Sequence, residues 1–154
     1  MNLQRLVERV RQVPLFSALG AEIVGFTGGR IHSWEEWQGP EEPLVENIGT
    51  RLQFLHDSLV AKSEEEKWNQ ALLLVVKLAS QNVPYVESED VWYGPNAAAW
   101  SAAWAFSLEE AYLSRNLPLP AELRAQLQWY EKGHWPCALL NLSRTENIED
   151  YVIY

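Results

Sequence analysis

A chain of 154 residues that is 47% hydrophobic and 21% charged is too apolar for an intrinsically disordered protein and has the size of one compact domain, which we place over residues 1–154. Its net charge of −9 disfavours nucleic acid and anionic membranes as partners, because phosphate binding needs Lys and Arg concentrated on one surface. The chain has a single cysteine and its N-terminus lacks the apolar core of a signal peptide, so we expect a cytoplasmic protein. The longest apolar run, Ala71–Val76, is too short to cross a membrane.

The N-terminal third of the chain predicts one helix followed by a short β element. Apolar residues at helical spacing from Leu3 to Val13 predict a first helix that stops at Pro14. Residues 22–32 contain two apolar segments around a T-G-G turn signal and predict a short hairpin. The Pro- and Gly-containing residues 33–43 are expected to be mostly loop.

Two helices are predicted in the middle of the chain. Apolar residues at steps of four, four, three and four predict a helix over Leu44–Leu59. A second helix follows the S-E-E-E segment and runs to about Ser80. It carries A-L-L-L-V-V, with apolar residues on every face, so we expect it to be buried nearly all round at the centre of the fold.

The C-terminal half predicts two further helices and a final strand. A helix begins at Pro95, and its many alanines leave room for neighbouring helices to approach closely. The next helix has Leu123, Leu127 and Tyr130 on one face, and Gly133 is placed to end it in the left-handed conformation. The terminal Y-V-I-Y is a short strand that we expect to join the 22–32 hairpin. The predicted fold is therefore mainly α, with about five helices and a minor β element.

The most reactive-looking segment is K-G-H-W-P-C, residues 132–137. His134 and Cys137, with His32 as a third candidate, would form a metal pair or a thiol–imidazole dyad in a Trp-lined ligand pocket. Zinc sites want four ligands, however, and the sequence supplies one pair with no second cysteine. The favoured interpretation is the end of a helix, so we expect no metal and no cofactor, and we lean away from an enzyme.

Other acid–base candidates are weaker. His56 and Asp57 lie off the apolar stripe of their predicted helix, which favours a solvated helix face. Acid pairs such as Glu109 and Glu110 are numerous, and sequence neighbours on a helix do not face each other.

A more distinctive pattern combines acids with tryptophans. Basic residues are absent from residues 31–50 and 78–114, which together contain five of the eight tryptophans and ten acids. Aromatic anchors among charges are typical of a protein-binding surface, although the alternative is that these tryptophans fold inward as loop plugs. The predicted partner-binding residues are Trp34, Glu35, Glu36, Trp37, Glu41, Glu42, Glu89, Asp90, Trp92 and Tyr93.

These patterns favour a protein-binding domain over an enzyme. The most concrete version is a bacterial inhibitor of the immunity or antitoxin type, in which negative charge speeds capture of a basic protein partner. The alternatives are a small-ligand-binding protein or enzyme that uses His134 and Cys137, and a subunit of a larger assembly. The sequence leaves the oligomeric state open.

Overall fold

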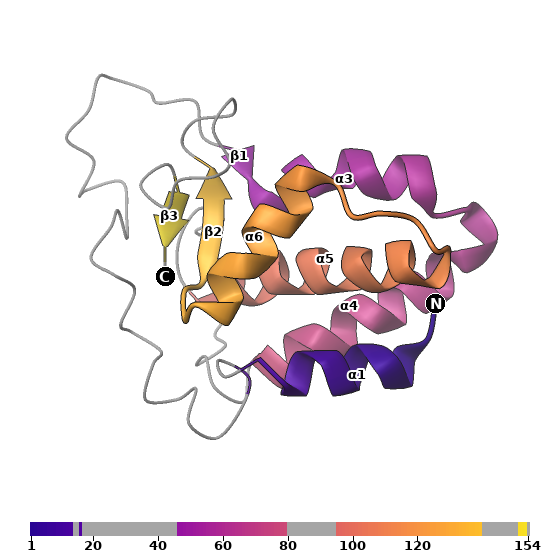
Figure 1. Ribbon diagram of the computed structural model, residues 1–154, viewed down its shortest axis with the longest axis horizontal. Helices are drawn as coiled ribbons and strands as arrows, with labels where there is room; N and C mark the ends of the chain where they lie inside the picture. The colour runs from indigo at the N-terminus through magenta and orange to yellow at the C-terminus, as the bar shows by residue number, and fades with distance from the viewer. Residues whose placement is uncertain (14–15, 17–45, 80–94, 140–150, 154) are drawn as a thin grey trace.

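A computed structural model describes residues 1–13, 16, 46–79, 95–139 and 151–153, and this part of the chain is mainly α, as predicted (Figure 1). Its α-helices are α1 (Leu3–Arg11), α3 (Ile48–Leu59), α4 (Glu65–Ala79), α5 (Pro95–Ser114) and α6 (Ala121–Glu131), with a short 3-10 helix η3 (Lys62–Glu64) before α4. None of the helices in the described ranges is long and apolar enough to cross a bilayer.

Helix α5 lies at the centre of the fold and contacts α1, α3, α4 and α6 (Figure 1). Small side chains explain this position, because Ala99, Ala102, Ala103 and Ala105 are completely buried. The distance between packed helices depends on the side chains at the contact, so alanines let several neighbours approach one backbone. The helix begins at Pro95, the predicted start.

The prediction that α4 is the central helix, buried nearly all round, is wrong. Trp68, Leu72 and Val75 face the core, but a stripe on the opposite face is exposed, including Leu73 with 60% of its surface accessible. The charged and amide residues between the apolar ones keep this face in water. The alanine-rich α5 takes the central position instead, since it can be surrounded at close range.

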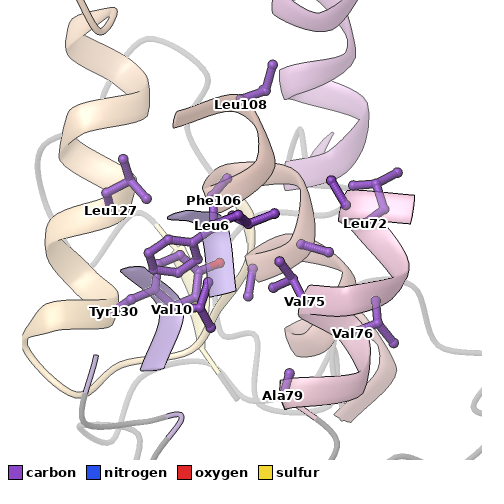
Figure 2. Packing of buried hydrophobic residues seen from close by; sticks show 14 of the residues in the cluster. Leu6, Val10, Leu72, Val75, Val76, Ala79, Phe106, Leu108, Leu127 and Tyr130 are labelled. Carbon is purple, nitrogen blue, oxygen red and sulfur yellow. The ribbon is translucent and has the colours of Figure 1, made fainter. Parts of the chain in front are cut away.

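The main core forms where α1, α4, α5 and α6 meet (Figure 2). Leu6 and Val10 are the buried residues of α1, and the amphipathic spacing of that helix is as predicted. Phe106 of α5 packs on Tyr130 of α6, with ring centroids 5.3 Å apart. Ile48 and Leu52 of α3 join this cluster, so side chains from five helices form one continuous core.

Gly133 ends α6 as the sequence predicts. Its φ of 90° lies in the left-handed region that glycine adopts without steric cost. Its N–H donates to the Tyr130 carbonyl at 3.1 Å, and the His134 N–H donates to the Trp129 carbonyl at 2.9 Å. These bonds satisfy carbonyls in the last turn of the helix.

A short antiparallel sheet has the order β1 (Glu46–Asn47), β2 (Pro136–Leu139) and β3 (Tyr151–Ile153). Because Glu46 pairs with Leu139 and Asn47 with Ala138, α3 begins at Ile48 and not at the predicted Leu44. The predicted 22–32 hairpin lies outside the described residues, so its pairing with the C-terminal segment stays a prediction. In the described sheet β3 pairs with β2.

Candidate functional site

The densest group of titratable and aromatic side chains centres on His56 of α3. The prediction that this residue lies on a solvated face is wrong, because His56 is only 8% exposed. Its Nδ1 lies 2.9 Å from a carboxylate oxygen of Asp57, and its Nε2 lies 3.1 Å from a carboxylate oxygen of Glu65. One buried imidazole thus bridges two acids, of which Asp57 is the more exposed.

Two tryptophans enclose the imidazole. The ring centroid of His56 is 4.7 Å from that of Trp68 on α4 and 5.6 Å from that of Trp104 on α5. The two indoles are themselves 5.3 Å apart in an edge-to-face arrangement, a favourable geometry for aromatic rings. Each of the three helices therefore contributes one ring to what we call the His56 cluster: His56, Asp57, Glu65, Trp68 and Trp104.

The sequence contains a signal for this burial. His56 lies four residues after Leu52 and three before Leu59, so it borders the apolar stripe of α3. An imidazole in such a position packs well against indole rings from neighbouring helices, and Trp68 and Trp104 supply them. Only long-range packing shows that these rings come together.

The ring nitrogens of His56 are directed at the two carboxylates, and Nε2 is buried without a hydrogen-bond partner. A base or a metal ligand needs a nitrogen lone pair that a substrate or an ion can reach, and burial closes the Nε2 of His56 to solvent. The Nε2–Glu65 contact has the distance of an ion pair without the alignment of a hydrogen bond. Within the described ranges, no three His, Cys, Asp or Glu residues gather in a way that would hold a metal ion.

An exposed aromatic residue lies beside the outer acid of the cluster. Phe54 is 75% exposed and stands three residues before Asp57, so the two side chains are neighbours on the surface of α3. The described surface therefore joins an apolar ring and an oriented carboxylate at this place.

A second polar group fixes α1 against α5. The guanidinium of Arg5 donates to Glu110 in a bidentate pair, with distances of 2.6 to 3.1 Å. Arg9 pairs with Glu109 at 2.8 Å and also with Glu131 of α6. Glu109 and Glu110 are two of the ten acids in residues 31–50 and 78–114, but both are buried and paired with arginines.

Glu110 is held in its ionised form. Burial by itself acts to raise the pKa of Glu110. Hydrogen bonds from Arg5, the backbone N–H of Asn2 and Ser114, together with the Arg5 charge, outweigh burial and lower the pKa below its ordinary value. The Glu110 hydrogen bond and charge in turn raise the pKa of Arg5. This carboxylate therefore belongs to the packing of the helices and is not presented to a partner.

The charge of the chain is divided unevenly. The described residues contain ten basic and ten acidic residues, and arginines of this part pair with its own acids, as in Arg51–Glu122 and Arg115–Glu64. The remaining segments of the sequence contain eleven acids and two arginines, which account for the whole net charge of −9. The helical part is thus balanced in charge, and the excess acid belongs to the other segments.

The structure describes little of the sites predicted from sequence. The ten predicted partner-binding residues, from Trp34 to Tyr93, and His32 lie outside the described residues. Trp100 and Trp104, two of the five tryptophans in the predicted acidic regions, pack partly buried against the core. The predicted binding surface therefore rests on Trp34, Trp37 and Trp92 alone among those tryptophans.

Of the alternative His134–Cys137 site, the structure describes His134, which follows the helix-ending Gly133 and is half-buried. Trp135 is buried beside it, with its ring centroid 6.0 Å from that of Tyr130. Cys137 lies in β2 at the point where the pairing with β3 is irregular. The helix end agrees with the interpretation favoured from the sequence.

Comparison with known proteins gives no assignment, since no family model, no curated protein and no solved structure matches the chain.

Proposed function

We propose that this protein is a small acidic cytoplasmic binding domain that captures a basic protein, most concretely an inhibitor of the immunity or antitoxin type. The observation that supports the proposal is the division of charge between the helical part and the remaining segments. With equal numbers of basic and acidic residues, the helical frame itself carries no excess charge. The eleven acids outside it carry the excess negative charge that would attract a cationic surface.

The aromatic residues among these acids supply the second half of the proposed interface. Trp34, Trp37 and Trp92 stand beside Glu35, Glu36, Glu41, Glu42, Glu89 and Asp90 in the sequence. Indole rings bury a large area at low entropic cost and are enriched in the residues that dominate binding energy. Charge would set the rate of association, and the rings would hold the complex.

The test uses charge reversal in matched pairs. One variant carries Glu35→Lys and Glu36→Lys, a second carries Glu89→Lys and Asp90→Lys, and a control carries Glu8→Lys and Glu131→Lys on the exposed surface of the helical frame. All three change the net charge by the same amount. Wild-type and variant proteins serve as baits for extracts of the source organism, and the captured protein is then purified for kinetics.

We expect a basic protein that binds the wild type and the control but associates at least about tenfold more slowly with either test variant, with a weaker dependence on salt. Equal loss in all three variants would mean that total charge acts without a localised surface. Unchanged binding by both test variants would show that the proposed residues are wrong.

A further inference from the structure

Helix α6 borders a cavity on the side opposite the residues that it buries in the core. The cavity has a volume of about 330 Å³, and its described lining consists of Ala121, Arg124, Ala125, Gln128 and Trp129. Steps of three, one, three and one residues keep this set on one side of the helix. Pockets that hold small molecules begin at about 300 Å³, so this volume suits a small organic molecule.

The two acids of α6 are engaged by arginines of other helices. Glu122 pairs with Arg51 of α3 at 2.6 Å, and Glu131 pairs with Arg9 of α1 at 2.8 Å. Neither acid lines the cavity. In its described lining the cavity therefore has no carboxylate that could neutralise a cation.

Two cations lie on this side of α6, and neither forms an ion pair with an acid among the described residues. They are Arg124 and Lys132. The Lys132 ammonium lies 4.9 Å from the centroid of the Trp129 ring, a contact that leaves its positive charge in place. The first turn of the helix begins at Ala121 and adds the positive end of the helix dipole. The described groups around the cavity are therefore net positive.

The guanidinium of Arg124 is placed to bind an oxyanion. Its Nη2 donates to the Leu119 carbonyl at 3.0 Å, which ties the side chain to the backbone before α6. This is the one hydrogen bond of that side chain among the described residues, whereas a guanidinium has five N–H donors. Two of the other donors can meet both oxygens of a carboxylate. Gln128, one turn further along, is exposed and adds an amide donor.

The rest of the described lining is apolar. Ala121 and Ala125 are small and leave room beside the helix, and Trp129 supplies a large ring. We propose that this cavity binds a small organic carboxylate, whose charged group pairs with Arg124 and whose apolar part lies against the alanines and Trp129. The site is independent of the proposed capture of a basic protein, because it uses none of the residues assigned to that function and takes a ligand of opposite charge.

The test measures binding of para-fluorobenzoate to the full chain by fluorine NMR at physiological salt. The matched ligand is para-fluorobenzamide, which has the same ring and no charge. We expect a dissociation constant of about 1 mM for the carboxylate, which is usual for a ligand of so few atoms. The amide should bind at least about tenfold more weakly, because it cannot accept a bidentate, charge-assisted pair from Arg124.

Variants of the arginine test its role directly. Arg124→Gln should weaken binding of the carboxylate at least about tenfold, and Arg124→Lys, which keeps the charge but loses the planar fork, should weaken it less. The matched control is Arg11→Gln, which removes the charge of an exposed arginine of α1 and should leave the dissociation constant unchanged. Helical content of each variant is checked by circular dichroism.

Several results would overturn the proposal. One is the absence of para-fluorobenzoate binding, and another is equal binding of the carboxylate and the amide. Equal losses for Arg124→Gln and Arg11→Gln would mean that the ligand responds to total charge without a defined site. Shifts in the backbone amide NMR spectrum on adding the carboxylate should centre on residues 121–129, and shifts centred elsewhere would contradict the assigned cavity.

Discussion

The two polar clusters around α5 differ in what they do with their acids. At the α1 contact, the buried carboxylate of Glu110 accepts hydrogen bonds from the Arg5 guanidinium, the Asn2 backbone N–H and the Ser114 hydroxyl. In the His56 cluster the buried group is the imidazole, and its acid partners Asp57 and Glu65 remain 64% and 41% exposed. The first arrangement uses acids to fix helices, while the second fixes acids at a surface.

We expect the rings of the His56 cluster to contribute more to the free energy of unfolding of the protein than its acids do. Trp68→Ala should produce the largest effect, about 3–5 kcal/mol lost from the free energy of unfolding, because a side chain that is 98% buried leaves a cavity. Urea denaturation measures the loss. Phe54→Ala, at an exposed aromatic residue, is the control and should cost less than about 0.5 kcal/mol.

At the α1 contact the acid itself should matter. Glu110→Ala removes a buried carboxylate with several charged or polar donors, and we expect a loss of about 2–3 kcal/mol in urea denaturation. Glu131→Ala is the matched control, because Glu131 also pairs with an arginine but is 51% exposed, and its loss should stay below about 1 kcal/mol. Similar losses for the two variants would remove the distinction between buried and exposed pairs.

The lowered pKa of Glu110 gives the α1 contact a pH dependence with a defined sign. The folded state holds this proton more weakly than the unfolded state, so the stabilisation is fully present above the ordinary glutamate pKa of about 4.3. It is lost as the pH falls through the lower pKa of the folded protein. The stability difference between wild type and Glu110→Gln should therefore be largest near neutral pH and shrink in acid, as measured by thermal unfolding across the pH range. A difference that grows in acid would reverse the assigned direction.

The smallest effect is expected at Asp57. Because this carboxylate is 64% exposed, Asp57→Asn should change the free energy of unfolding by less than about 0.5 kcal/mol. Chemical denaturation of the variant beside the wild type measures it. A loss above about 1.5 kcal/mol would mean that the His56 cluster uses its acids as the α1 contact does, and the contrast between the two would fail.

Local patterns predicted most of the helices but not their positions relative to one another. The start of α5 follows from Pro95, the buried face of α6 from Leu123 and Leu127, and the end of α6 from Gly133. Each of these roles depends on nearby residues. The prediction of the central helix was wrong because it relied on apolar content. When several helices pack around one helix, small side chains on that helix matter more than its apolar content. The buried alanines place α5 at the centre, although α4 carries the larger apolar residues.

The polar residues show why the candidate site was harder to predict than the helices. Arg5 and Arg9 are one turn apart, yet nothing in their own segment indicates that their partners are about a hundred residues away. The position of His56 off the apolar stripe of its helix predicts a solvated face, whereas Trp68 and Trp104 decide its environment. Contacts between distant segments determine whether an acid or an imidazole is paired, buried or available.

The buried alanines of α5 also bear on how this protein can change during evolution. A position where even one added methyl group meets a neighbouring helix tolerates few residues other than glycine, serine or alanine. The exposed faces of α3 and α4 carry no such restriction. We therefore expect substitutions to be tolerated more readily on the exposed faces of the outer helices than in the middle of α5.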